Sequence, residues 1–235
     1  GIWIELVQGR GGARTAPPGF VEGLSEIAET HGIPLVIDEV QSGFGRTGQW
    51  FASDWYDLTP DVVTMGKAIG GVGLPLSATM YREDLDTWGS SGHAGTFRGN
   101  LPAMRAGVRA IEYMRAHDLL GQVRDLGAHV RTRLCEIGER TDAVGPPRGK
   151  GLYLGAPLVD PETGDPSAEL AAAVQEACFA NGLLVTTGGL DDAVLNIRPP
   201  LVLTRELADA GLDIIEEAVD DEIGRASCRE RVYCE

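Results

Sequence analysis

Short apolar runs recur along the first third of the chain, and each ends close to a glycine or a charged residue. These runs cover residues 2–7, 35–37, 62–65 and 76–81. They do not alternate between apolar and polar residues, as a strand with one solvent-exposed face does. Such uninterrupted apolar runs are typical of strands buried on both faces. Between the first two runs, apolar positions follow a helical spacing that stops at Gly32. The pattern predicts an α/β unit whose sheet is covered on both faces.

The second half of the chain alternates between helical and strand patterns. Helical spacing runs from Ala103 to about Gly138 and then breaks at Gly145-Pro146-Pro147. Ser167 is a candidate N-cap of a further helix. Strands are predicted near residues 152–157, 183–186 and 194–198, and helices at 167–181 and 204–223. We interpret this half as a second, smaller α/β unit and place the domains at residues 1–118 and 119–223.

Both ends of the chain are unusual. Residues 224–235 change abruptly to an Arg-rich and Cys-rich composition with neither helical nor strand periodicity. We interpret them as a non-native tail, the alternative being a disordered natural one. The chain also begins inside a predicted strand and without an initiator Met, so we interpret it as an N-terminally truncated fragment.

Charge and cysteine usage narrow the class of protein. The net charge of −15 argues against a nucleic acid or an anionic membrane as partner, because both require clustered positive charge. The apolar runs are far too short to span a bilayer. The cysteines at 135, 178, 228 and 234 have no CxxC or zinc spacing, which predicts reduced thiols in a cytoplasmic protein and no metal site.

Two of the predicted strands end at ionisable residues. Asp38-Glu39 follows the run at 35–37, and Lys67 follows the run at 62–65. Ligands of open α/β sheets collect beyond the carboxyl ends of the strands, so Asp38 and Lys67 are candidates to share one pocket. One interpretation is a structural ion pair. The other is a pyridoxal phosphate site, in which a lysine forms an imine with the cofactor and an acid keeps the ring nitrogen protonated.

The loop at residues 43–48, GFGRTG, matches the GxGxxG pattern of nicotinamide-binding proteins. In those proteins a helix begins at the glycines, so that its N-terminus meets the pyrophosphate. The residues that follow, 49–55, have no helical face. An oxidoreductase is therefore the less favoured interpretation, and we expect the glycines to shape a loop.

Four blocks of the sequence, in order, resemble the class III (omega) aminotransferases. They are residues 5–9 (ELVQG, where the family usually has Pro at position 6), 35–78, 95–100 (GTFRGN) and 198–201 (RPPL). The resemblance implies a pyridoxal-phosphate-dependent transferase of fold type I. The chain would hold the C-terminal part of the large domain, with a mostly parallel sheet, and the small domain. It also implies a homodimer with a shared active site.

The resemblance assigns roles to residues of the cofactor site. Lys67 would form the imine and then move the substrate proton. Asp38 would pair with the ring nitrogen, Val40 would pack on the ring face, and Gln41 would contact the ring's phenolic oxygen. Thr96 would reach the cofactor phosphate of the neighbouring subunit. On local sequence alone, Gln41 could instead cap the loop, and Thr96 could be a strand-end hydroxyl.

The resemblance also assigns residues to the substrate. Arg198 would hold an α-carboxylate, to which a planar guanidinium is suited, although a surface charge is the alternative. Glu5 is similar to the family's gating glutamate. Arg98 stands where most members carry a small residue, and together with its neighbours it resembles the diaminobutyrate–2-oxoglutarate branch, in which it could hold a second carboxylate. His93 is interpreted as a solvated loop residue.

The implied reaction transfers an amino group between 2,4-diaminobutyrate and 2-oxoglutarate. Other class III aminotransferases, acting on 4-aminobutyrate, ornithine or acetylornithine, remain alternatives, as do a decarboxylase or an aminomutase on the same scaffold. The family's phosphate-binding helix start and ring-stacking aromatic residue lie upstream of these blocks. We therefore expect the chain alone to bind the cofactor poorly and to be inactive.

Overall fold

The computed structural model describes residues 1–71, 73–90, 92–96 and 98–233, and the side chains of these residues up to 224. The chain divides into two compact units. The first comprises Gly1–Val7 and Ala16–Gln122, and the second comprises Gln8–Thr15 and Val123–Glu235. The predicted boundary after residue 118 lies four residues before this division, and the assignment of Gln8–Thr15 to the second unit was not predicted.

The first unit is built on a four-stranded sheet in the order β1-β2-β3-β4. Its strands are β1 (Ile2–Ile4), β2 (Leu35–Asp38), β3 (Val62–Met65) and β4 (Ala78–Tyr81). β1, β2 and β3 are parallel, and β4 is antiparallel to β3. The carboxyl ends of the three parallel strands therefore lie at one edge of the sheet.

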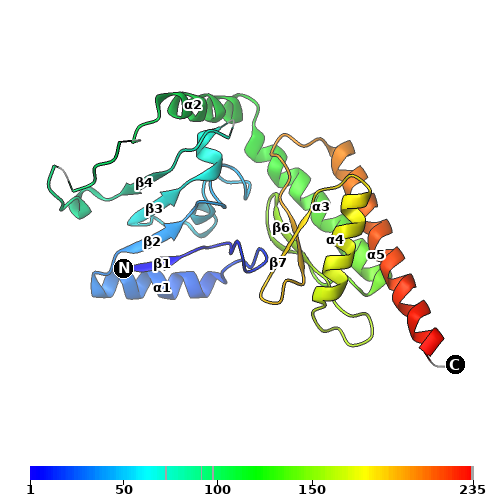
Figure 1. The fold of residues 1–235 in the computed structure, drawn as a ribbon. Helices are drawn as coiled ribbons and strands as arrows, with labels where there is room; N and C mark the ends of the chain where they lie inside the picture. The colour runs from blue at the N-terminus through cyan, green and yellow to red at the C-terminus, as the bar shows by residue number, and fades with distance from the viewer. Residues whose placement is uncertain (72, 91, 97, 234–235) are drawn as a thin grey trace. The chain divides into compact units, whose positions relative to one another are not determined.

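Helix α1 (Pro18–His31) is the crossover between β1 and β2, and it runs beside β1 (Figure 1). Proline is tolerated at its first position because the N–H there has no intrahelical acceptor. The helix ends at Gly32, which adopts a left-handed conformation with φ of 60°. Both the helix and its stop confirm the prediction from the apolar spacing.

The remaining helical elements of the first unit are short, except α2. They are η1 (Ala52–Tyr56), η2 (Lys67–Gly70), η3 (Glu83–Leu85) and α2 (Leu101–Ala116). The side chain of Asn100 caps α2 by accepting a hydrogen bond from the N–H of Ala103 at 3.2 Å. A Cβ at Gly107 would lie only 2.3 Å from the carbonyl oxygen of Ile69, so glycine permits the close packing of α2 on η2.

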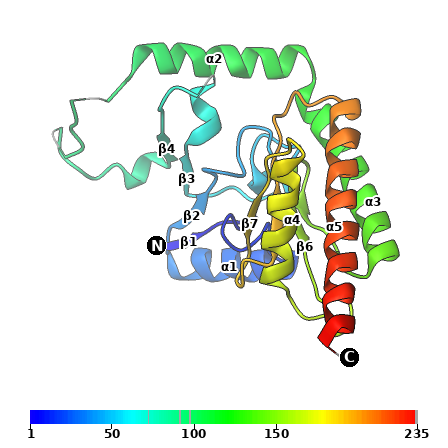
Figure 2. The ribbon, with the colours of Figure 1, turned by 45° about the vertical axis from the view of Figure 1, so that its right-hand side comes forward.

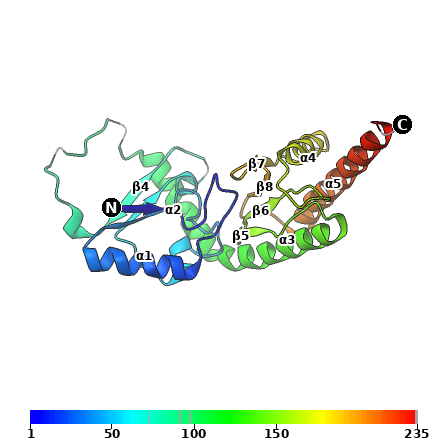
Figure 3. The same ribbon diagram turned by 90° about the horizontal axis from the view of Figure 1, so that it is seen from below.

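The second unit has an antiparallel sheet in the order β5-β6-β8-β7. Its strands are β5 (Arg148–Lys150), β6 (Tyr153–Pro157), β7 (Thr186–Gly188) and β8 (Val194–Ile197), and its helices are α3 (Leu119–Thr141), α4 (Ala168–Ala180) and α5 (Arg205–Tyr233). Figure 3 shows α3 running along β5, and Figure 2 shows α4 beside α5. As predicted, the hydroxyl of Ser167 caps α4, accepting from the N–H of Leu170 at 3.2 Å.

Three expectations for the second half were wrong in detail. The single helical stretch is interrupted, because Asp118 adopts a left-handed conformation with φ of 46° between α2 and α3. β7 begins at Thr186 instead of ending there. Helical backbone continues through residues 224–233, which lack helical periodicity, while residues 234–235 lie outside the described part.

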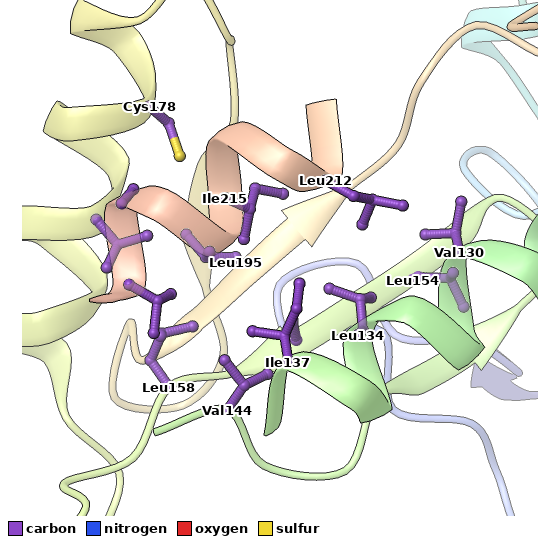
Figure 4. Close-up of a cluster of buried hydrophobic side chains, with 14 of the residues drawn as sticks. Val130, Leu134, Ile137, Val144, Leu154, Leu158, Cys178, Leu195, Leu212 and Ile215 are labelled. Carbon is purple, nitrogen blue, oxygen red and sulfur yellow. The ribbon is translucent and has the colours of Figure 1, made fainter. Parts of the chain in front are cut away.

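One apolar core joins α3, α4 and α5 to strands β6 and β8 (Figure 4). Leu134 and Ile137 of α3 and Leu154 of β6 are completely buried in it. Cys178 of α4 is buried in the same core, and burial raises the pKa of its thiol to about 11. A thiol with so high a pKa stays protonated and unreactive at neutral pH. The second unit therefore has a core of its own.

Leu134→Ala is expected to lower the free energy of unfolding by about 3 kcal/mol, because it leaves a cavity in this core. Leu184→Ala, at a side chain that is 81% exposed, should change it by less than about 0.5 kcal/mol. Urea unfolding followed by circular dichroism measures both effects. The tryptophans, at positions 3, 50, 55 and 88, all belong to the first unit, so their fluorescence reports separately on that unit.

Candidate active site

Three of the predicted site residues follow the carboxyl ends of the three parallel strands. Glu5 comes directly after β1, Asp38 is the last residue of β2, and Lys67 comes two residues after β3. Ile4 is aligned with Ile37, and Asp38 with Thr64, so Glu5, Asp38 and Lys67 lie at the same edge of the sheet. The placement of Asp38 and Lys67 at one sheet edge is as the sequence predicted.

The carboxylate of Asp38 is partly fixed by its own backbone. Its Oδ1 accepts a hydrogen bond from the N–H of Val40 at 3.0 Å, which closes a turn just beyond β2. The side chain is half-buried. This hydrogen bond fixes the Asp38 carboxylate at the edge of the sheet, and it engages only Oδ1 of the two carboxylate oxygens.

Lys67 has a strained backbone. It is an exposed residue with φ of 47°, a conformation that L-residues with side chains seldom adopt. The preceding Gly66 is buried, and a Cβ placed on it would lie 3.3 Å from Cγ1 of Val40. Val40 thus packs over Gly66, next to the lysine. Strain of this kind is concentrated at functional sites, where the surrounding structure maintains it.

Lys67, Thr96 and Arg98 line one cavity of about 1760 Å³ in the first unit. His93 also lines it, and the ring centroids of His93 and Trp88 are 6.2 Å apart. Asp38, Val40 and Gln41 are not among the lining residues. The predicted residues thus form two sets. Lys67, Thr96 and Arg98 line the cavity, whereas Asp38, Val40 and Gln41 lie on the turn beyond β2. Val40 links the two sets, because it packs on Gly66, the residue before Lys67. Phe97 of the predicted block lies outside the described residues.

The GFGRTG segment forms turns. Phe44, Gly45 and Gly48 have positive φ angles of 53°, 85° and 85°. Residues 43–51 are all described, and the next helical element, η1, begins only at Ala52. No helix N-terminus is available at these glycines for a pyrophosphate, which confirms that they shape a loop.

Arg198 lies in the second unit and is held on three sides. Its Nη2 donates to the carbonyl oxygen of Gly9 at 2.8 Å and to Oδ1 of Asn196 at 2.7 Å. Its guanidinium carbon lies 4.7 Å from the ring centroid of the buried Tyr153, a cation–π contact. These contacts fix the guanidinium plane, so the interpretation of Arg198 as an ordinary surface charge is wrong.

Sequence reasoning missed Glu39. Its side chain is completely buried, and burial raises the pKa of its carboxyl group, opposed by hydrogen bonds from Ser42, Ala52 and Ser53. The alternation of buried residues along β2 predicts that the side chain of Glu39 is buried. Leu35, Ile37 and Glu39 are buried in alternation along β2, so Glu39 continues the inward face of the strand.

The described part of the chain has neither a metal site nor a membrane span among its helices. No group of His, Cys, Asp and Glu side chains there is arranged to hold a metal ion. Within the same residues, every helix is too short or too polar to cross a membrane. Of the four cysteines, Cys135 and Cys178 are free thiols, while the side chain of Cys228 and all of Cys234 lie outside the described part.

Asp38 and Lys67 lie at one edge of the sheet, Lys67 has a strained backbone, and the chain forms two units. This combination is typical of a class III aminotransferase. The model of that family matches residues 1–219, and the chain belongs to this family. The α/β fold with its mostly parallel first sheet is shared with solved class III transaminases.

Relatives within the family differ in their named activities. The chain is 42% identical over 226 residues to a diaminobutyrate–2-oxoglutarate aminotransferase of Rhizobium meliloti, covering 93% of this chain and 47% of that protein. It is 40% identical over 222 residues to a leucine/methionine racemase of Thermococcus litoralis, covering 94% and 49%. A phospholyase structure from Arthrobacter superposes with a TM-score of 0.86 at 34% identity, over 93% of this chain and 52% of that one. The chain spans about half the length of the curated relatives it matches.

Proposed function

We propose that the protein is a pyridoxal-phosphate-dependent aminotransferase acting between 2,4-diaminobutyrate and 2-oxoglutarate. The observation that carries the reaction class is the strained, exposed Lys67 beside Val40 and Asp38 at the carboxyl edge of the sheet. The diaminobutyrate relative, at 42% identity, supports the substrate. Aminotransferases as a class use an amino donor and a 2-oxo acid.

The residues at the sheet edge fit this cofactor. A lysine that lines a cavity can reach an aldehyde, and a carboxylate on the neighbouring strand can face a cationic ring nitrogen. Val40 supplies an apolar surface next to Lys67, because it packs over Gly66. When bound, the cofactor supplies an electron-withdrawing ring to the carbon that carries the amino group.

Each residue of the first unit then has a defined task. Lys67 would hold the cofactor covalently and would carry the proton at the reacting carbon of the substrate. Asp38 would keep the ring nitrogen protonated, because its negative charge favours the cationic form. Val40 would pack on the ring, Gln41 would contact its phenolic oxygen, and Thr96 would bind the phosphate.

The arginines bind the carboxylates of the substrates. Arg198 binds the α-carboxylate, and its contacts with Asn196 and Tyr153 support this role because they pre-orient the guanidinium. Arg98, in the same cavity as Lys67, binds the second carboxylate of 2-oxoglutarate. Glu5, which directly follows β1, is assigned the part of the family's gating glutamate.

Initial-rate kinetics of the full-length enzyme test the substrate. With 2-oxoglutarate as acceptor, kcat/KM for 2,4-diaminobutyrate should exceed that for ornithine at least about tenfold, since a single methylene is discriminated to this degree. A preference for ornithine or 4-aminobutyrate would contradict the substrate and leave the reaction class standing. The racemase relative makes racemisation the second candidate. Formation of D-methionine from L-methionine without a 2-oxo acid would favour it.

The proposal includes a cytoplasmic homodimer in which Thr96 serves the neighbouring subunit's site. Thr96→Val should weaken cofactor binding about tenfold, because a hydrogen bond to a charged phosphate is lost. In a random mixture of Lys67→Ala and Thr96→Val chains, half of the dimers are mixed and each has one intact site. At a cofactor concentration too low to load the Thr96→Val sites, about a quarter of the wild-type activity should then return, as two-fold symmetry requires. No recovery would show that Thr96 acts on Lys67 of its own chain, whose cavity it shares.

A further inference from the structure

Glu39 directly follows β2 and connects this strand to the loop that begins at Val40. Its backbone N–H donates to the carbonyl oxygen of Thr64 at 2.9 Å, which extends the β2–β3 ladder by one residue. Its carbonyl oxygen accepts from the N–H of Gly43 at 3.0 Å. The backbone of Glu39 is therefore fixed to the sheet on one side and to the start of the loop on the other.

The side chain of Glu39 reaches both ends of the same loop. Oε1 accepts a hydrogen bond from the N–H of Ser53 at 3.0 Å, across fourteen residues of sequence. Oε2 accepts from the hydroxyl of Ser42, and the N–H of Ala52 is a further donor. One buried carboxyl group thus closes the segment between Val40 and Ser53, which we call the Glu39 loop.

The Glu39 loop carries two of the residues assigned to the cofactor. Val40 follows Glu39 directly and packs over Gly66, and Gln41 comes next. Space at the closure is tight, because a Cβ at Gly43 would lie 2.8 Å from the carbonyl oxygen of Glu39 and 3.3 Å from Cδ1 of Phe51. A shift of the closure would therefore be transmitted to Val40 and Gln41.

We propose that Glu39 is a positioning residue, which clamps the Glu39 loop so that Val40 and Gln41 stay in place beside Lys67. This inference rests on the proposed function of the site. An apolar residue could fill the same buried space but could not satisfy the N–H of Ser53, and an unsatisfied buried donor is costly. Asp38, one residue earlier, points to the opposite face of the strand, so the two adjacent acids have separate tasks.

Hydrogen–deuterium exchange and cofactor titration of the full-length enzyme test the clamp. In Glu39→Ala, amide exchange within residues 40–53 should rise at least about tenfold, since the hydrogen bonds that close the loop are lost. Exchange in α1 and in the second unit should be unchanged. The dissociation constant for pyridoxal phosphate, followed by absorbance, should rise by a similar factor.

Two further variants separate the clamp from other roles. Glu39→Gln keeps an oxygen acceptor for Ser53 and should restore both exchange and cofactor affinity to within about threefold of wild type. Glu26→Ala, at an exposed acid on α1, should change neither. If Glu39→Ala does not fold, Ser42→Ala removes only the hydroxyl donor and should raise exchange in residues 40–53 alone.

Several results would overturn the clamp. The first is unchanged amide exchange in residues 40–53 of Glu39→Ala. The second is a Glu39→Gln variant whose amide exchange and cofactor affinity are as impaired as those of Glu39→Ala. The third is amide exchange that accelerates equally in both units. Unfolding of Glu39→Ala combined with unchanged exchange in Ser42→Ala would also do so. The exchange results need no activity. A wild-type enzyme that fails to bind pyridoxal phosphate would therefore contradict the proposed function while the exchange data still decide the clamp.

Discussion

Lys67→Ala in the full-length enzyme is expected to lower kcat for transamination at least about 10³-fold, because it removes both the covalent anchor and the proton carrier. The fold should survive, since the Lys67 side chain is exposed and belongs to no apolar core of the described residues. The free energy of unfolding should change little, because φ of 47° is unfavourable for lysine and for alanine alike.

Lys150 provides a demanding control, because it and Lys67 are the two lysines of this chain. Burial, together with the nearby Arg131, lowers the pKa of Lys150. A lowered pKa leaves more of the amine unprotonated at neutral pH, so on pKa alone Lys150 would be a candidate nucleophile. Its place on β5, in a unit without the Asp38 turn, argues against that role. For Lys150, geometry and pKa thus make opposite predictions.

Borohydride reduction of the cofactor-loaded enzyme, followed by peptide mass spectrometry, distinguishes the two lysines. We expect the pyridoxyl mass on the Lys67 peptide and not on the Lys150 peptide. Lys150→Ala should retain activity within about threefold of wild type, as is usual for a residue that does not touch the reacting groups. Lys67→Arg, which keeps the charge but cannot form the covalent link, should be as inactive as Lys67→Ala. Activity retained in Lys67→Ala would favour a binding protein over an enzyme.

The strands that carry the site could be predicted from the sequence because their apolar runs are short, uninterrupted and bounded by glycine or charge. The same pattern located Asp38 and Lys67, since parallel strands end at a common edge. The positive φ of Lys67 could not be predicted, because no local preference of lysine favours it and only the packing of Val40 on Gly66 reveals the constraint. In the sequence, only the glycine at position 66 indicated that the backbone before Lys67 is closely packed.

Other features escaped prediction because tertiary contacts decided them. β5 contains Arg148, Gly149 and Lys150, a composition typical of loops, and it forms a strand by pairing with β6. Segment 8–15 joins the second unit because Gly12 packs against Gly155: a Cβ on Gly155 would lie 2.7 Å from the Gly12 carbonyl oxygen. Neither contact can be recognised from the residues of β5 or of segment 8–15 alone.

Asp38→Asn tests the second half of the site, because it removes one charge and keeps the shape. Asparagine still offers Oδ1 to the N–H of Val40, so the turn bond of 3.0 Å can persist. The free energy of unfolding should change by less than about 1 kcal/mol. Without the negative charge the ring nitrogen is no longer held protonated, so kcat should fall at least about 10²-fold. The KM for the amino donor should change less than kcat, because the lost interaction acts on the reacting ring.

Asp61→Asn is the matched control for this substitution. Asp61 precedes β3 at the opposite edge of the same sheet, where its Oδ2 accepts from the N–H of Leu35 at 2.7 Å and its Oδ1 pairs with Arg82 at 2.6 Å. Removing its charge should affect stability modestly and leave kcat unchanged. Steady-state kinetics and urea unfolding of both variants give the comparison. If Asp38→Asn keeps full activity, Asp38 serves only to close the turn at Val40, and the acid at the end of β2 has no part in the chemistry.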